Sequence, residues 1–177
     1  KAFSKLNCNP THLNFFERTP NLRSILNKQD VIYVGGGNTK SMLAVWKEWK
    51  LDILLKKLYD KGKVFCGVSA GSICWYKQGI TDSWASNLSI LDCLGFIDEV
   101  NCPHYYGEKD RQPSVHAFIS DNKIESCYAS EDGSALHYKD GKLIGSIAFY
   151  KGAKSYFIHK KSNEIIEEVV PGIDLNN

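Results

Sequence analysis

The chain has 177 residues and a mass of 19.9 kDa, which is enough for one domain with a well-developed core. Hydrophobic residues make up 43% and charged residues 24%, a composition typical of a folded globular protein. The net charge is only +2 and no basic block occurs, which argues against a nucleic-acid partner. Neither an apolar run of 18 residues nor a signal-like start is present, so the sequence predicts no membrane partner and no secretory route.

Six cysteines are spread along the chain without any C-x-x-C spacing: Cys8, Cys66, Cys74, Cys93, Cys102 and Cys127. Three of them, Cys66, Cys102 and Cys127, lie in apolar runs, where buried thiols are common. We therefore expect reduced core residues in a cytoplasmic protein. A disulfide framework or a zinc site is the alternative.

The first third of the chain predicts helical pieces at 14–16 and 22–26, then a strand, a glycine turn and two helices. Asp30–Val34 is a short β-branched run typical of a buried strand, and it ends in the turn Gly35-Gly36-Gly37-Asn38. Helical spacing follows in two sets separated by a break near Asp52: Met42, Leu43, Trp46 and Trp49, then Ile53, Leu54 and Leu58.

A second strand, Val64–Val68, leads into the pentapeptide Gly67-Val68-Ser69-Ala70-Gly71, and a helix is predicted at 73–76. The repeated order of strand, glycine turn and helix is typical of a parallel sheet with right-handed crossovers. Ligands of such sheets gather at the carboxyl ends of the strands, where both glycine turns lie.

The second half predicts a loop-rich segment followed by short elements. Residues 79–95 lack clear periodicity. The elements expected after them are a strand at 96–100, a short helix carrying Val115, Phe118 and Ile119, a strand at 123–129, and an antiparallel ribbon at 135–138, 142–150 and 156–159. No internal repeat occurs, so residues 1–177 are expected to form a single domain.

The pentapeptide has the G-x-S-x-G pattern that places a serine on a sharp strand-to-helix turn. Its glycines, Gly67 and Gly71, are needed because a Cβ at either position would collide with the neighbouring strand and helix. The turn exposes the hydroxyl of Ser69 and directs the N–H of Ala70 toward the group that the oxygen attacks. Ser69 is therefore a candidate nucleophile, and a chance match in a small-residue turn is the competing interpretation.

A serine hydroxyl needs a base to accept its proton, and the base needs an orienting carboxylate. Among five histidines, His104 is the best candidate, because it follows a strand and Pro103 in a loop. The acid is expected on the turn after the strand at 123–129, at Asp132 or Glu131. A hydrogen-bonded or solvated side chain is the competing interpretation for each of these residues.

Four stretches together resemble the peptidase E family of serine peptidases, the aspartyl dipeptidases related to cyanophycinase. They are Val31–Thr39, Gly67–Ser72, Pro103–Tyr105 and Glu131–Tyr138, in the family's order. The resemblance implies an α/β fold like that of class I glutamine amidotransferases, with a mainly parallel sheet flanked by helices. The antiparallel C-terminal ribbon follows that sheet. The order Ser, His, acid also differs from that of α/β-hydrolases, in which the acid precedes the histidine.

The resemblance carries catalytic roles over to particular residues. Ser69 corresponds to the nucleophile and His104 to the general base. The resemblance favours Asp132 as the acid, because this residue keeps the family's spacing to the strand that follows. Family members commonly have a glutamate at this place, so Glu131 is the alternative acid.

The glycine turn after the first strand is expected to supply half of an oxyanion hole. A second N–H must approach the oxyanion opposite that of Ala70, and only glycine lets a backbone come so close. We expect Gly37 to donate, with Gly36 beside it. A phosphate-binding loop is the alternative, but the required third glycine or Gly-Lys-Ser/Thr is absent.

Asn38 and Arg111 are the expected substrate-binding side chains. The resemblance implies a preference for an N-terminal aspartate, whose carboxylate is best met by a bidentate guanidinium. Arg111, seven residues after His104, is the nearest cation of this kind, and a surface arginine is the competing interpretation.

These expectations combine into a serine peptidase that cleaves short peptides, Asp-X dipeptides among them, through an acyl-enzyme and without a metal or cofactor. The alternatives are a non-catalytic or regulatory ligand-binding member of the same fold, and an esterase or amidase that uses the same site. The expected partner is a small peptide substrate, and a homodimer is left open. The family's opening strand and helix have no visible counterpart, so we expect a fragment, a processed form or a diverged start.

Overall fold

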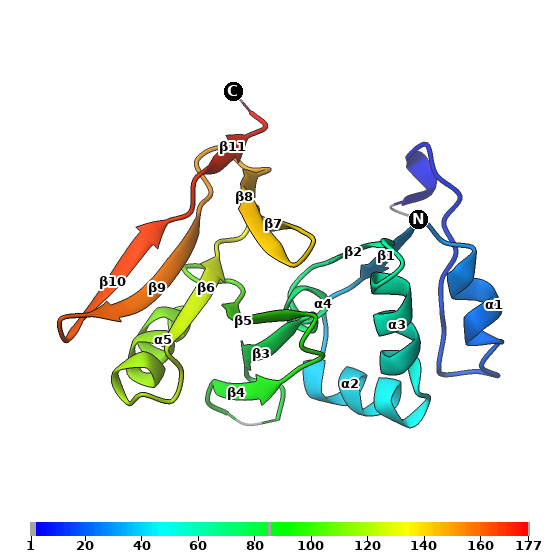
Figure 1. Cartoon of the computed structure of the whole chain (residues 1–177), viewed down its shortest axis with the longest axis horizontal. Helices are drawn as coiled ribbons and strands as arrows, with labels where there is room; N and C mark the ends of the chain where they lie inside the picture. Colours follow the sequence, from blue (N-terminus) through cyan, green and yellow to red (C-terminus); the bar gives the residue numbers. More distant parts are fainter. Residues whose placement is uncertain (1–2, 85, 177) are drawn as a thin grey trace.

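The computed structural model describes residues 3–84 and 86–176 (Figure 1). Its helices are η1 (Phe3–Lys5, a 3₁₀ helix), α1 (Leu22–Asn27), α2 (Thr39–Glu48), α3 (Leu51–Tyr59), α4 (Ala70–Ile73) and α5 (Arg111–Ser120). Its strands are β1 (Val31–Val34), β2 (Val64–Gly67), β3 (Tyr76–Thr81), β4 (Ser89–Asp92), β5 (Ile97–Cys102), β6 (Ser126–Ser130), β7 (Ser134–Lys139), β8 (Lys142–Ala148), β9 (Ser155–Lys161), β10 (Glu164–Val169) and β11 (Gly172–Asp174). Helices α1 to α3 gather with β1 and β2 at one end, and α5 lies with the β9–β10 hairpin at the other.

The predicted unit of strand, turn, two helices and strand is present. β1 and β2 pair in parallel, with Val31 opposite Val64. Asn38 caps α2, because its side chain accepts the N–H of Ser41. α2 and α3 separate at Lys50, whose φ is 53°, close to the predicted break. The buried face of the unit consists of Ile32, Leu43, Trp46, Leu51, Leu55 and Leu58.

The largest sheet is mixed, so the expectation of a mainly parallel sheet is not met. Its order is β10-β9-β6-β5-β3-β4, and among its described strands only β3–β5 and β5–β6 pair in parallel. The pairs β3–β4, β6–β9 and β9–β10 are antiparallel. Both ends of the sheet are built from hairpins, which need only a short turn, whereas a parallel neighbour needs a long crossover. The protein is thus a mixed α/β fold with helices beside its sheets.

Strands replace a predicted helix and a predicted loop after the serine turn. The prediction of a helix at 73–76 is wrong, because α4 is a single turn that ends at Ile73 and β3 begins at Tyr76. The segment 79–95 contains the end of β3 and all of β4. The last three residues of β3 are all buried, so this strand lacks the polar and apolar alternation that reveals a half-buried strand.

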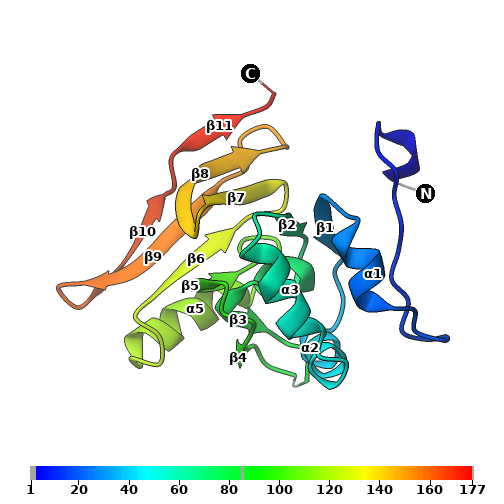
Figure 2. The ribbon, with the colours of Figure 1, turned by 45° about the vertical axis from the view of Figure 1, so that its right-hand side comes forward.

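The antiparallel ribbon predicted for the C-terminal part is present only in its first two strands, β7 and β8. The third predicted strand, β9, pairs instead with β6 and β10 in the larger sheet, and β10 and β11 are additional strands. β7 pairs antiparallel with β8, and β11 joins β8 to make a three-stranded sheet beside β6 and β9 (Figure 2). The sequence pattern does not predict β10 and β11, whose side chains are mostly exposed or half-buried. Residues 14–16, predicted as helical, form no helix, and a bend covers 15–17.

All six cysteines are free thiols, and the prediction of burial holds for Cys102 and Cys127. It is wrong for Cys66, which is exposed because alternate side chains of β2 face outward from the two-stranded sheet. Within residues 3–84 and 86–176, no helix has the length and apolar character needed to cross a membrane. The same residues contain no cluster of three His, Cys, Asp or Glu side chains suited to a metal ion.

The backbones of β1, β2 and α4 meet at the serine turn with no room for side chains between them. A Cβ on Gly67 would lie 2.1 Å from Gly71 O, and a Cβ on Gly71 would lie 2.1 Å from Val34 O. Because real Cβ atoms do not come so close to backbone oxygens, either side chain would push α4 away from the strands. The predicted need for both glycines is confirmed.

Gly71→Ala should therefore destabilise the protein. We expect a loss of about 3 kcal/mol or more, which corresponds to roughly 10 °C in the midpoint of thermal unfolding. The matched control is Gly35→Ala, because a Cβ at Gly35 meets nothing within 4 Å. Circular dichroism melting curves measure both variants, and equal midpoints would contradict the close packing described above.

Candidate active site

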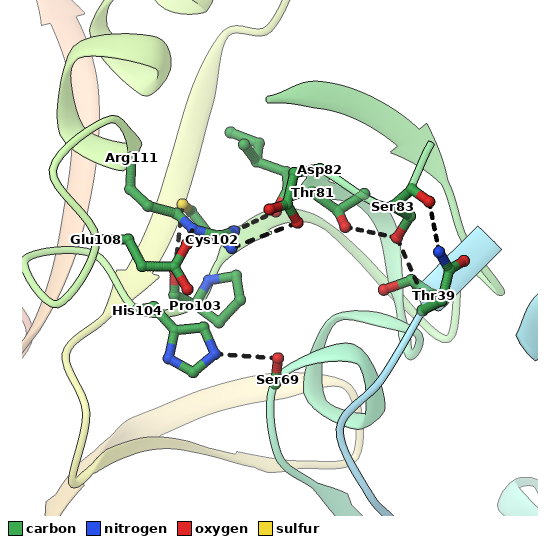
Figure 3. A network of polar contacts seen from close by, with 12 residues as sticks. Thr39, Ser69, Thr81, Asp82, Ser83, Cys102, Pro103, His104, Glu108 and Arg111 are labelled. Atoms are coloured by element: carbon green, nitrogen blue, oxygen red, sulfur yellow. Dashed lines mark hydrogen bonds and ion pairs between the residues drawn. The ribbon is translucent and has the colours of Figure 1, made fainter. Parts of the chain in front are cut away.

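Ser69 occupies the turn between β2 and α4 in a strained backbone conformation. Its φ of 55° and ψ of −118° lie outside the regions that residues with a Cβ favour. Backbone bonds hold the turn, since the N–H of Gly71 donates to Val68 O and the N–H of Ser72 donates to Ser69 O, both at 2.9 Å. The hydroxyl of Ser69 projects toward His104 (Figure 3).

His104 lies in the loop after β5, also with a positive φ, of 56°. Its Nε2 is 3.0 Å from Ser69 Oγ, a distance at which a base can take the hydroxyl proton (Figure 3). The loop is held on both sides of the imidazole, because the N–H of Tyr105 donates to Ser130 O and the N–H of Glu108 donates to His104 O, both at 3.0 Å. The structure thus brings the predicted serine and histidine together.

Asp132 lies on the turn between β6 and β7, at the other edge of the imidazole. Its Oδ1 is 2.5 Å from His104 Nδ1. A proton on Nδ1 leaves Nε2 free to accept the proton of Ser69. The side chains of Asp132 and His104 are 61% and 24% exposed, so water screens the pair and its effect is orientation more than stability.

Glu131, the other carboxylate left open by the sequence, turns away from the imidazole. Its Oε1 accepts the hydroxyl of Tyr156 at 2.6 Å, and its Oε2 accepts the N–H of Lys154 at 3.0 Å. Both oxygens are therefore bound to β9 and to the residue before it. Of the two carboxylates, Asp132 is the one that contacts His104.

Gly107 lies against the candidate carboxylate, a contact that the sequence pattern does not predict. A Cβ at this position would lie 2.7 Å from Asp132 Oδ2. The missing side chain therefore makes room for the carboxylate against the loop that carries His104. In the sequence this residue is visible only as a glycine three positions after His104. Its role depends on the turn between β6 and β7, which is distant in the sequence.

The glycine turn after β1 packs against the serine. A Cβ on Gly36 would come within 3.3 Å of Ser69 Cβ, and Gly37 has a φ of 147° with open space around it. Among the described residues, neither the N–H of Gly37 nor that of Ala70 finds a hydrogen-bond acceptor. Unpaired N–H groups beside a nucleophile are the donors that an oxyanion hole requires.

Asn38 is engaged with the protein. Its Oδ1 accepts the N–H of Ser41 at 2.8 Å, and its Nδ2 donates to Ser83 O. The side chain therefore links the start of α2 to the segment after β3.

Arg111 begins α5 and is only 4% exposed. Its Nε donates to Glu108 Oε2 at 2.8 Å (Figure 3). Its Nη1 donates to Ile80 O at 2.9 Å. Asp82 Oδ1 lies 4.0 Å from Nη2. The guanidinium that was expected to meet a substrate carboxylate thus already donates to two protein acceptors through two of its three nitrogens.

A cavity of about 860 Å³ opens beside the serine and the histidine. Its walls come from β2, the serine turn, the His104 loop and the β6–β7 segment, and Ser69, Ser72, His104 and Asp132 all line it. A cleft of this size lies within the range of small-ligand sites and can hold a short peptide next to the nucleophile.

Enzymes that hydrolyse acyl compounds through a serine use this order of hydroxyl, imidazole and carboxylate on several unrelated folds. Comparison with known families identifies the chain as a peptidase. The model of peptidase family S51 matches residues 1–145, and the chain belongs to this family.

Individual relatives agree with the family. The chain is 45% identical over 171 residues to the uncharacterized peptidase YgaJ of Bacillus subtilis, covering 96% of this chain and 74% of that protein. It is 31% identical over 155 residues to the uncharacterized peptidase Lin0382 of Listeria innocua, covering 84% and 74%. It is 28% identical over 148 residues to Peptidase E of Haemophilus influenzae, covering 77% and 64%. The predicted resemblance is confirmed, and the chain is a serine-type peptidase by family.

The geometry predicts different effects for the two carboxylates. Asp132→Asn should slow the labelling of Ser69 by a fluorophosphonate probe by about 10²- to 10⁴-fold, because it removes the acceptor that orients the imidazole. Glu131→Gln is the matched comparison and should slow labelling by less than about tenfold, since this side chain holds the turn through Tyr156 and Lys154 but does not touch the imidazole. Labelling time courses measure both rates. A larger loss in the Glu131 variant would reverse the assignment.

Proposed function

We propose that this protein hydrolyses short peptides by acyl transfer through Ser69. The Oγ attacks the carbonyl carbon of the scissile bond while His104 Nε2 takes the hydroxyl proton. The N–H groups of Gly37 and Ala70, with Gly36 packed beside them, stabilise the oxyanion of the tetrahedral intermediate.

Acylation is completed when His104 gives its proton to the leaving amine and the C–N bond breaks, which leaves an acyl-enzyme. Deacylation is the second half of the reaction. A water molecule then attacks the ester carbon while His104 acts as base again. The acid product leaves and Ser69 regains its proton. Asp132 keeps the imidazole oriented through both halves.

The observation that carries this proposal is the continuous contact from Ser69 through His104 to Asp132, with distances of 3.0 and 2.5 Å. Three segments far apart in the sequence supply these groups, and a serine in a strained turn lies at one end. Strain of this kind is retained where the surrounding structure enforces it, which happens most often at functional sites.

Short peptides are the proposed substrates, and Asp-X dipeptides are the first class to test. Membership of a peptidase family and similarity to a relative named Peptidase E support peptides over other acyl compounds. We likewise propose a fold of the class I glutamine amidotransferase type, supported by the β1 to β2 unit and its serine turn. A cytoplasmic location is proposed on the strength of six free thiols.

Ser69→Ala should abolish peptide hydrolysis while leaving the fold intact. We expect kcat to fall at least about 10³-fold, because Ser69 carries the hydroxyl that contacts His104 Nε2. A panel of Asp-X and Ala-X dipeptides, assayed by release of free amine, measures turnover beside melting curves of both proteins. Undiminished turnover would refute the mechanism. Wild-type activity on simple esters alone would indicate an esterase, and an unreactive wild-type Ser69 would indicate a ligand-binding protein.

Arg111→Met should lower the midpoint of thermal unfolding by about 5 °C, because it removes the buried bond to Ile80 O and the partner of Glu108. We expect the ratio of KM for Asp-X to KM for Ala-X dipeptides to stay unchanged, since the guanidinium already donates to groups of the protein. Lys109→Met, at an exposed neighbour, is the control. A rise in KM confined to Asp-X substrates would instead assign Arg111 to substrate specificity.

A further inference from the structure

One carboxylate on β10 receives hydrogen bonds from two other parts of the chain. Glu167 belongs to a strand that lies beyond residues 1–145, the part that matches the family. Its partners are the hydroxyl of Tyr105 at 2.8 Å, the hydroxyl of Tyr106 at 2.7 Å, Nε2 of Gln112 at 2.9 Å and Nε2 of His116 at 2.6 Å. The two tyrosines lie in the loop after β5, and the other two residues belong to α5.

The Glu167 carboxylate is mostly buried yet charged. Its side chain is 17% exposed, and burial by itself opposes ionisation. The hydrogen bonds that it accepts outweigh this effect and lower its pKa below the usual value. A charged acceptor forms stronger hydrogen bonds than a neutral one, so Glu167 holds its partners firmly.

The tyrosines that Glu167 holds follow His104 directly in the sequence. The positive φ of His104 costs about 1–3 kcal/mol, and such a conformation persists only where its surroundings enforce it. Tyr105 is fully buried and is held at both ends, by the bond from its N–H to Ser130 O and by the bond from its hydroxyl to Glu167. The loop therefore cannot relax without breaking contacts to Glu167.

The same tyrosines also contact the support of Asp132. The rings of Tyr105 and Tyr106 lie 5.7 and 5.5 Å from the ring of Tyr156. The hydroxyl of Tyr156 donates to Glu131, the residue before Asp132. One aromatic cluster thus touches the loop that carries the histidine and the turn that carries the carboxylate, and Glu167 anchors this cluster from β10.

We propose that Glu167 is a positioning residue for the reaction, holding Tyr105 and Tyr106 so that the imidazole of His104 stays between Ser69 and Asp132. Glu167 contacts none of these three side chains itself, so it acts through the two tyrosines. The inference rests on the proposed function, because the position of His104 affects the rate only if His104 is the base. Displacing a reacting group by about 1 Å can cost about 100-fold in rate.

Glu167→Gln tests this role, because it keeps the shape of the side chain but removes its charge and turns an amide N–H₂ toward the donors. We expect kcat and the rate of fluorophosphonate labelling at Ser69 to fall together by about tenfold or more, with KM changed less than about twofold. Glu168→Gln is the matched control, because the neighbouring Glu168 is 60% exposed and contacts His159 on β9. It should leave all three quantities unchanged.

Tyr106→Phe is a second, milder variant that removes one donor from a half-exposed side chain and should cost about threefold in kcat. Titration of active sites with the probe separates positioning from folding. A lower fraction of active molecules with unchanged kcat per active molecule would overturn the proposal, and so would full activity of Glu167→Gln.

A readout that does not depend on activity separates this inference from the proposed function. The proton between His104 Nδ1 and Asp132 can be followed by nuclear magnetic resonance and assigned with a His104→Gln variant. We expect its signal to move or broaden in Glu167→Gln and to stay in place in Glu168→Gln. If wild-type Ser69 fails to react with the probe, the proposed function fails. An unmoved proton signal overturns the positioning role in either case.

Discussion

The close approach of three backbone segments around Ser69 is the constraint on which the rest of the site depends. Val34, at the end of β1, touches Gly71 so closely that no Cβ fits, and Gly71 touches Gly67 in the same way. This contact puts the glycine turn after β1 beside the serine, with Gly36 against its Cβ. The hydroxyl and the proposed oxyanion donors are therefore placed by backbone packing. The imidazole and the carboxylate lie on loops after β5 and β6, strands of another sheet, and the contact between their side chains orients them.

Features that depend on local backbone conformation could be predicted from the sequence, because they require particular residue types at particular positions. The serine turn needs glycine at 67 and 71, and that demand leaves a visible pentapeptide. The helices after β1 were visible because apolar residues recur with the helical period, and Leu43, Trp46 and Leu58 of the predicted set lie on the buried face, although Trp49 and Ile53 are exposed. His104 was visible through its place after a strand, a pattern that the parallel β3–β5–β6 part of the sheet preserves.

Features that depend on distant partners could not be predicted. Asp132 and Glu131 are adjacent in sequence, and the choice between them follows from Tyr156 and Lys154, which hold the glutamate on the far side of the turn. The same limit applies to Glu167, whose donors lie on other elements. The strands β3 and β4 escaped prediction because tertiary packing, rather than alternation, decides their conformation.

The positive φ values at Ser69 and His104 have a consequence for the evolution and engineering of this molecule. Each costs about 1–3 kcal/mol, against a typical net stability of about 5–15 kcal/mol for a whole domain. A considerable share of the folding free energy is thus held as strain at two positions. A substitution that relaxes the backbone at Ser69 or at His104 would raise the free energy of unfolding and lower the reactivity of the site. Stability and activity are therefore traded against each other at these two positions.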